Sequence, residues 1–352
     1  MARRKWQQVY QDILEQIRSG RYPQGSRFPS VEELCRIYEP SNITIRRACE
    51  ELKKDGWVTT RDRQGAYVTE PLKELKIFLC NKSFSADFLK DSMPLRHFHE
   101  TVEAYAAGIP VNIIPVTLDQ VMEDADAITA PMVVFFNTFV DADGMRFRIN
   151  RERIDFFRER FNPLVFGGYE ETQGMHQIRV NRYHAFRRAV RYLADKGHRR
   201  IGYVSQMLTI PGVLERFKGY LDGMAECGIM GYSELVKTVP RSDYNEVDGV
   251  MAEFLAQPEP PSAIIFSNDR KALNALAFCR RHGVKVPEQL AVIGYDGTPD
   301  GALSEPPLTT FAGTPLEAGR HIMDYVKLCR IGMTGRILSY ELESPFIERG
   351  SA

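Results

Sequence analysis

The sequence is short of the features that mark membrane, secreted or metal-binding proteins. Its six cysteines are scattered and none stands in a CxxC pair, so neither a zinc site nor a disulfide framework is expected. No apolar run approaches the length of a membrane span, and the opening MARRKWQQ has no apolar signal core. We find no internal repeat and no low-complexity segment. A cytoplasmic protein is expected.

The formal net charge is zero, because 46 basic residues balance 46 acidic ones. The balance is uneven, since residues 1–70 hold 13 Lys and Arg against 10 Asp and Glu. This small excess permits binding of nucleic acid without requiring it. The 352 residues are long for one core and predict two or three domains, and 43% hydrophobic residues are typical of a folded globular chain.

One N-terminal segment predicts a helix with two different faces. Ser41 is a favourable N-cap whose hydroxyl can accept a hydrogen bond from a free amide, and Gly56 suits a left-handed helix end. The apolar residues recur at helical spacing and are Ile45, Ala48, Cys49 and Leu52. The first turn and the other face carry Asn42, Thr44, Arg46 and Arg47. Such groups suit base edges and phosphates in the DNA major groove, although a solvated surface helix would look similar.

The segments around this helix favour the DNA-binding interpretation. Residues 5–19 keep helical spacing, and Ser30 to Glu33 forms a capping box that begins a second helix through Tyr38. Two short strands, 57–60 and 66–68, flank a tight turn with two arginines. Three helices and a hairpin predict a winged helix-turn-helix, α+β in class. The expected DNA contacts are Ser30, Ser41, Asn42, Thr44, Arg46, Arg47, Arg61, Arg63, Gln64 and Gly65.

This part of the chain resembles the DNA-binding domain of the GntR family of bacterial transcription regulators. The matching residues are Tyr10, Ile13, Ile17, Gly20, Gly25, Phe28-Pro29-Ser30, Glu33-Leu34, Ser41, Thr44 to Ala48, Leu52, Gly56 and Gly65 to Val68. Asn42 stands where the family usually has Arg, Glu32 where many members have Arg, and Pro40 where Val is usual. Because Asn pairs well with adenine and Arg with guanine, the resemblance implies DNA binding but leaves the operator sequence open.

From residue 76 onward, short apolar strands alternate with amphipathic helices, which predicts parallel α/β sheets in two lobes. The expected strands are 76–80, 111–116, 132–136, 164–166, 201–204, 235–239, 263–266 and 290–295. The expected helices include 183–196, 216–227, 244–256, 270–282 and 315–330. We expect residues 1–70 to form the DNA-binding domain, 71–76 the linker, and 77–352 a two-lobed effector-binding and dimerisation domain.

From about residue 180 the chain resembles the effector domain of LacI-type repressors, which is similar to type I periplasmic sugar-binding proteins. The motifs are GHRRI at 197–201, RFKGY at 216–220, AIIFSND at 263–269, VPEQLAVIGYD at 286–296, PLTT at 307–310 and RGS at 349–351. A GntR-type head on a LacI-type body is similar to the arabinose-repressor branch of the GntR family.

Three polar residues are expected at the ligand cleft. Asn268 and Asp296 follow predicted strands, at the edge of an open α/β sheet where ligands bind. Arg216 is expected to begin a helix and reach the same cleft. An amide, a carboxylate and a guanidinium can bracket vicinal hydroxyls, and the resemblance implies effector contact for all three. Alternatively, Asn268 and Asp296 cap local turns and Arg216 lies on the surface. Phe84 and Tyr169 are weaker candidates for stacking on a sugar.

These patterns predict a ligand-responsive regulator that represses carbohydrate-utilisation genes, binds a palindromic operator as a homodimer and uses no cofactor. No nucleophile stands near a base at readable spacing, so no enzymatic activity is expected. His97 and His99 would point to different helix faces, so no metal site is expected. Two alternatives stay open: a body that is only a dimerisation scaffold or protein-docking platform, and a sugar-processing enzyme with a DNA-binding head.

Overall fold

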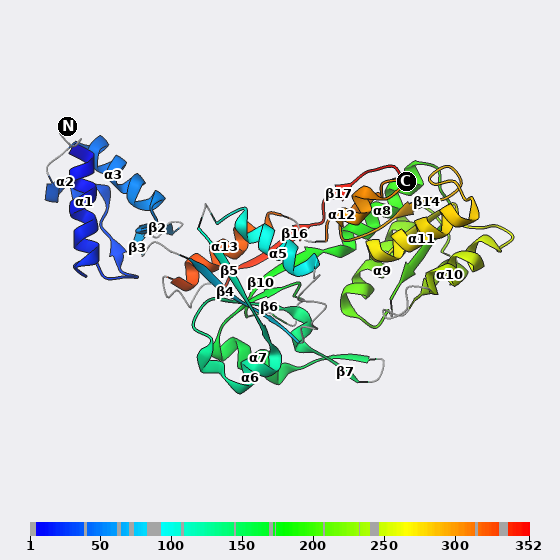
Figure 1. Cartoon of the computed structure of the whole chain (residues 1–352), viewed down its shortest axis with the longest axis horizontal. Helices are drawn as coiled ribbons and strands as arrows, with labels where there is room; N and C mark the ends of the chain where they lie inside the picture. Colours follow the sequence, from blue (N-terminus) through cyan, green and yellow to red (C-terminus); the bar gives the residue numbers. More distant parts are fainter. Residues whose placement is uncertain are drawn as a thin grey trace.

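The computed structural model contains three successive units (Figure 1). It describes residues 5–38, 41–61, 65–69, 74–82, 93–106, 109–143, 146–168, 172, 174–206, 208–231, 233–239, 246–313, 316–330 and 337–352. Across these ranges no helix combines the length and apolar composition needed to cross a membrane.

The N-terminal unit is a winged helix-turn-helix, as predicted. Its elements are α1 (Lys5–Arg18), β1 (Arg27–Phe28), α2 (Val31–Tyr38), α3 (Asn42–Lys54), β2 (Val58–Arg61) and β3 (Gly65–Val68). The three helices share one apolar core with the antiparallel sheet β1-β3-β2, whose two-residue first strand was not predicted. The predicted capping box is confirmed, since the Glu33 amide donates to Ser30 Oγ at 3.2 Å and the Ser30 amide to Glu33 Oε2 at 2.7 Å.

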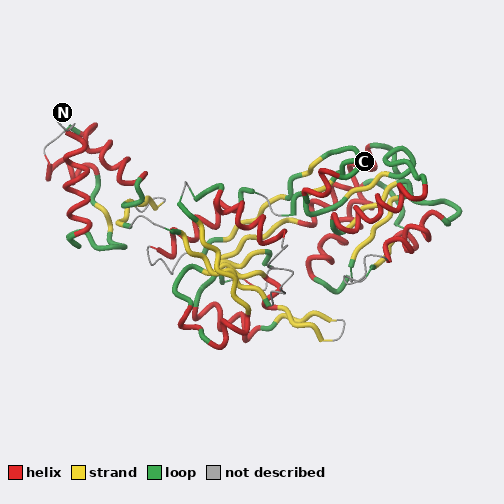
Figure 2. Tube along the Cα trace, in the orientation of Figure 1, coloured by secondary structure: helices red, strands yellow, loops and turns green. Residues whose placement is uncertain are grey.

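The second unit, here the first lobe, is a six-stranded parallel sheet with helices on both faces (Figure 2). Its strand order is β16-β10-β9-β6-β4-β5. The elements are β4 (Leu75–Asn81), α5 (Met93–Glu103), β5 (Val111–Thr117), α6 (Leu118–Glu123), β6 (Met132–Phe135), α7 (Arg151–Arg160), β9 (Leu164–Phe166), β10 (His176–Asn181), α13 (Ala318–Arg330) and β16 (Ser339–Glu343). One apolar core joins the sheet to α5 and α13, and another joins it to α6 and α7. A small hairpin, β7 (Val140–Asp143) and β8 (Arg146–Ile149), extends from this lobe.

The third unit, here the second lobe, is a four-stranded parallel sheet of order β12-β11-β13-β14. Its elements are α8 (Arg182–Asp195), β11 (Ile201–Ser205), α9 (Pro211–Glu226), β12 (Val236–Thr238), α10 (Glu246–Leu255), β13 (Ala263–Phe266), α11 (Asp269–His282), β14 (Ala291–Ile293), α12 (Pro299–Leu303), β15 (Thr310–Phe311) and β17 (Phe346–Ile347). Helices α8 and α9 cover one face, and α10 and α11 the other. The predicted pair of parallel-sheet lobes is therefore confirmed.

The chain passes between the two lobes three times. It leaves the first lobe after β10, returns between β15 and α13, and leaves again after β16. Strands β10 and β16 pair in parallel with Arg179 opposite Glu341, although 162 residues separate these two partners. Neither strand was predicted, so the sequence analysis missed the elements that join the lobes.

One predicted helix boundary was wrong in a way that affects the site. We expected a helix from Arg216, whereas α9 begins at Pro211, so Arg216 lies one and a half turns inside it. Proline at the first helical position has a favourable φ and no amide to satisfy, which explains the earlier start. The expected strand 290–295 is also shorter, because only Ala291–Ile293 pairs as β14.

Candidate functional site

Helix α3 presents a polar face to solvent and an apolar face to the core of the head. Ser41, Asn42, Arg46 and Arg47 are exposed and Thr44 is half-buried. The four apolar residues of the predicted inner face are all buried. The structure therefore gathers five of the ten expected DNA contacts on one short stretch of helix surface.

Ser41 does not act as predicted. It occupies the N-cap position, but its side chain accepts no hydrogen bond from the backbone amides of the first turn. Its hydroxyl lies 2.9 Å from the Thr44 hydroxyl, so the two side chains satisfy each other. The amide-capping expectation for Ser41 is therefore wrong, because Thr44 supplies a nearer partner than the helix amides.

Two arginines of this surface are held by neighbouring side chains. The Arg46 Nε donates a hydrogen bond to Asn42 Oδ1 at 3.0 Å, one helical turn earlier. The Arg47 guanidinium lies over the Trp6 ring of α1, with Cζ 5.0 Å from the ring centroid. Both cations thus have fixed directions before any DNA is bound.

The remaining expected DNA contacts are only partly visible. Ser30 is exposed at the start of α2, where its hydroxyl serves the capping box. Gly65 begins β3 with φ +98°, a backbone conformation that favours glycine. Arg61 ends β2, but its side chain lies outside the described residues, as do Arg63 and Gln64.

The three predicted effector residues come together in the second lobe. Arg216 donates from Nη1 to the Ser267 carbonyl at 2.8 Å, which places it beside Asn268. Its guanidinium also lies over the Tyr295 ring, with Cζ 4.4 Å from the centroid, next to Asp296. The cluster stands just beyond β13 and β14, at the carboxyl edge expected for a ligand site in an open α/β sheet.

Asp296 is held in an unusual backbone conformation. Its φ is +135°, which L-residues rarely adopt, and its amide donates to the Phe311 carbonyl at 2.9 Å. Burial raises the pKa of the Asp296 carboxyl to about 7, with Arg216 opposing the shift and the buried Asp269 adding to it. Gly313, on the crossing towards α13, passes so close that a Cβ there would lie 3.3 Å from Asp296 Oδ1. The carboxyl group is thus positioned next to an interlobe crossing.

Asn268 plays the capping role that we considered as the alternative. It is the N-cap of α11, and its Oδ1 accepts a hydrogen bond from the Lys271 amide at 2.9 Å. What Asn268 can offer a ligand is therefore its amide NH2 group.

The structure adds three charged residues that the sequence analysis missed. The Arg182 Nη1 lies 3.5 Å from Glu215 Oε2. The Arg182 Nη2 also approaches the first lobe, since a Cβ added to Gly167 would lie 3.3 Å from it. Burial raises the pKa of Glu215, and Arg182 lowers it in part. Lys271 is fully buried in the first turn of α11, and its charge acts on Asp296. A lysine in the first turn of a helix is unfavourable to the helix dipole. This placement is the sequence feature that could have drawn attention to Lys271.

The raised pKa of Asp296 predicts a pH-dependent stability. Between about pH 4 and pH 7 the folded protein keeps a proton that an unfolded aspartate has lost, because the ordinary pKa is 3.8. The free energy of unfolding should therefore fall as pH rises through this window and stay level above it. We expect a loss on the order of 2 kcal/mol between pH 5 and pH 8, since each pKa unit corresponds to about 1.4 kcal/mol.

Urea unfolding of wild type and Asp296→Asn at both pH values measures this effect. The amide cannot ionise, so the variant should lack this part of the pH dependence. Asp300→Asn is the matched control, because Asp300 is exposed on α12 four residues further on. Equal pH dependence in wild type and Asp296→Asn would contradict the prediction.

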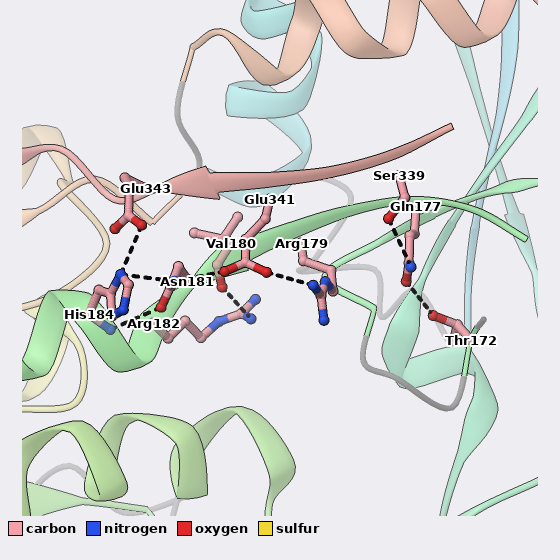
Figure 3. Close-up of polar contacts among 10 residues, drawn as sticks. All are labelled: Thr172, Gln177, Arg179, Val180, Asn181, Arg182, His184, Ser339, Glu341 and Glu343. Carbon is pink, nitrogen blue, oxygen red and sulfur yellow. Dashed lines mark hydrogen bonds and ion pairs between the residues drawn. The ribbon is translucent and has the colours of Figure 1, made fainter. Parts of the chain in front are cut away.

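A ladder of polar side-chain contacts joins β10 to β16 and continues to the start of α8 in the second lobe (Figure 3). Gln177 donates to Ser339 Oγ at 3.1 Å, and Arg179 pairs with Glu341 at 2.6 Å. Asn181 also donates to Glu341, at 2.8 Å, while the His184 Nδ1 lies 3.0 Å from Glu343 Oε1 at the start of α8. Both strands leave the first lobe here, so this ladder ties together two of the three connections that a rearrangement of the lobes must bend.

Phe84 and Tyr169, the weaker stacking candidates, lie outside the described residues. Among the described residues of the first lobe, Gly167 is the one that we place against the second-lobe charges, through its close approach to Arg182. The second lobe supplies the cations, carboxylates and amide described above.

Two known protein families match separate parts of the chain. Residues 5–68 match the family described as bacterial regulatory proteins, gntR family. Residues 190–351 match the periplasmic binding protein-like domain. The chain thus joins a gntR-type helix-turn-helix domain to a periplasmic-binding-protein-like domain.

Similar proteins are transcription regulators. The HTH-type transcriptional repressor CytR of Escherichia coli K12 is 36% identical over 169 residues, covering 46% of this chain and 48% of CytR. The repressor PurR of Pasteurella multocida is 25% identical over 284 residues, or 78% of this chain and 73% of PurR. The chain spans about half the length of the CytR repressor that it matches at 36% identity.

Solved structures share the fold. A regulatory protein of the LacI family from Chloroflexus aggregans aligns with a TM-score of 0.64 at 21% identity, covering 78% of this chain and 98% of that one. A complex of the transcriptional regulator CelR with cellobiose aligns with a TM-score of 0.63 at 18% identity, covering 92% of this chain and all of that one.

Proposed function

We propose that this protein is a sequence-specific transcriptional regulator whose affinity for DNA depends on a small molecule. The observation that carries the proposal is the pairing of two surfaces in one chain. One is the exposed polar and basic face of α3, and the other is the polar cluster around Asp296 beside an interlobe crossing. Residues 1–70 would bind the operator and residues 77–352 the effector. The chain acts in the cytoplasm, where bacterial DNA lies, and no catalytic role is assigned to it.

The proposed effector is a sugar or sugar derivative. Arg216 supplies donors, Asp296 supplies an acceptor, and Asn268 supplies an amide, which together match hydroxyl groups that both donate and accept. The CelR structure is a cellobiose complex, and a LacI-family regulator from Enterococcus faecium was solved with bound ribose. CytR and PurR are named repressors, so we extend repression to this chain as well.

The proposed mechanism is a change in lobe placement. A ligand that contacts the Asp296 cluster and the first lobe near Gly167 would favour one arrangement of the lobes over another. The three crossings, and above all the β10–β16 ladder, would bend or shift in response. In a homodimer on a palindromic operator, this would change the spacing of the two α3 helices, and affinity for DNA would change by the coupling free energy.

The test uses the full chain. Operator DNA is first selected from a random-sequence library, and mono- and disaccharides are then screened for thermal stabilisation. A binding sugar should raise stability by about 2.7 kcal/mol at about 100 times its Kd. The same sugar should change operator affinity with the same half-maximal concentration. A ligand that binds without altering operator affinity at any concentration would refute the proposed coupling, and failure to enrich any DNA sequence would refute the DNA-binding function.

A further inference from the structure

The solvent-facing side of α3 includes a strongly exposed apolar side chain. Ile43, in the first turn of α3, is 80% exposed, although Ile45 two positions later is fully buried in the head core. Its immediate neighbours on the exposed surface, Asn42 and Arg46, are polar. An isoleucine left in water among polar groups at the start of this helix suggests an apolar partner that arrives with the DNA.

The major groove offers one prominent apolar group on its base edges, the 5-methyl group of thymine. The remaining major-groove groups that distinguish the base pairs are hydrogen-bond donors and acceptors. A branched aliphatic side chain at the start of a recognition helix can therefore discriminate bases only by contact with that methyl group.

Asn42 contributes differently from what its residue type suggests. Pairing with adenine requires the side-chain oxygen to accept from N6 and the NH2 group to donate to N7. In the structure this oxygen already accepts from Arg46 Nε at 3.0 Å. The bond occupies one of the two lone pairs of the oxygen and turns the pair towards donation, through the Asn42 NH2 group and the two terminal nitrogens of Arg46. Guanine, with its N7 and O6 acceptors, is the complementary base edge.

We propose that Asn42 is a positioning residue, which aims Arg46 at a guanine, and that Ile43 determines specificity by contacting a neighbouring thymine methyl group. This rests on the proposed DNA-binding function. The sequence left the operator open, because asparagine as a residue type pairs well with adenine. The Asn42–Arg46 hydrogen bond fixes the guanidinium fork before binding, so less side-chain freedom is lost on the operator.

Base preferences of variants separate a positioning residue from a reading residue. Binding sites are selected from random DNA with wild type, Asn42→Asp and Asn42→Ala. Asp keeps an oxygen acceptor for Arg46 but cannot donate, and as a reader it would prefer cytosine. We expect the Asp variant to keep the wild-type guanine, with weaker affinity for all sequences because of its charge. We expect the Ala variant to lose about 5- to 150-fold discrimination at that guanine alone, the range for one bidentate contact.

A selected adenine that becomes cytosine in Asn42→Asp would overturn the positioning role. Arg46→Gln provides a second test, because it should abolish the preference for guanine at one position of the wild-type site. The positioning role would also be overturned if no preference for guanine depended on Arg46. Both results presuppose an enriched site and so leave the proposed function standing. The failure of the proposed function is a different result, in which wild type enriches no sequence.

The contact of Ile43 is tested by removing a single methyl group from the DNA. Each thymine of the wild-type site is replaced by deoxyuridine in turn. At one thymine per half-site we expect a loss of about four-fold, the value for burying one methyl-sized group. Ile43→Ala should bind the thymine and deoxyuridine sites equally. Ile37→Ala is the matched control, because Ile37 of α2 is another exposed isoleucine of the head, and it should retain the four-fold difference.

Equal binding of all deoxyuridine sites by wild type would overturn the role of Ile43. So would a loss that persists unchanged in Ile43→Ala. Because Ile43 and Asn42 are exposed, neither substitution removes a core contact, and thermal unfolding of each variant verifies that the head is folded.

Discussion

Arg216→Met should lower the affinity for the effector about 100-fold, as expected when a desolvated charged group that contacts a ligand is truncated. The guanidinium is the largest opposing influence on the raised pKa of Asp296, so its loss should raise that pKa further above about 7 and leave less carboxylate at neutral pH. The Ser267 carbonyl also loses its donor. Methionine keeps an aliphatic contact with the Tyr295 ring, so the fold should persist. Titration calorimetry with the sugar found by thermal screening measures the loss.

Arg188→Met is the matched control for this substitution. Arg188 also stacks on an aromatic ring of the second lobe, with Cζ 5.1 Å from the centroid of Phe346, but it is not among the charges that act on Asp296. Its affinity for the effector should stay within about two-fold of wild type. If both variants lost affinity equally, the cause would be a general effect on the lobe, and the assignment of Arg216 to the site would fail.

A large effect on folding is expected from Gly219→Ala in α9. A Cβ at this position would lie 2.2 Å from the Tyr183 carbonyl oxygen of α8, an obstacle that is backbone and cannot rotate away. Helices α8 and α9 would have to separate, and the apolar core that they share would loosen. We expect a destabilisation of about 3 kcal/mol, at the upper end for overpacking.

Urea unfolding followed by circular dichroism measures this loss. Both tryptophans, Trp6 and Trp57, lie in the head, so tryptophan fluorescence follows the head separately and should be unchanged. Gly249→Ala in α10 is the control, because a Cβ there meets nothing within 4 Å. It should stabilise the protein by about 0.5–1 kcal/mol, since alanine favours a helix over glycine. Destabilisation of equal size in both variants would show that Gly219 is required for its backbone freedom rather than for the close approach of α8.

The sequence was most informative where structure depends on neighbours along the chain. The capping box at Ser30 and the helix end at Gly56, which has φ +77°, could be predicted because each depends on a few consecutive residues. The same holds for the strand at Ala263–Phe266, a short apolar run between turn residues. The convergence of Arg216, Asn268 and Asp296 could be anticipated from the resemblance and, for Asn268 and Asp296, from their places after strands.

The sequence was least informative where contacts join distant segments. Nothing local to Arg179 shows that Glu341 lies opposite it, and the polar composition of β10 and β16 hides two strands that lie in the same sheet. Asn42 could not be identified as the partner of Arg46, because residue type alone suggested adenine. The burial of Lys271 follows from the packing of α11 against its sheet, which a composition count cannot show.

Because the chain crosses between the lobes three times, no single break in the gene separates the coding sequence of one lobe from that of the other. Helix α13 and strand β16 are encoded after most of the second lobe, yet they complete the sheet and core of the first. A gene fragment that ends before α13 would leave the first lobe without one edge strand and without one of the two helices, α5 and α13, that cover one face. The head is joined to the body by a single passage of the chain, so recombination can exchange it in one event. Exchange of the head would therefore leave both lobes intact, whereas exchange of one lobe requires several breaks in the chain.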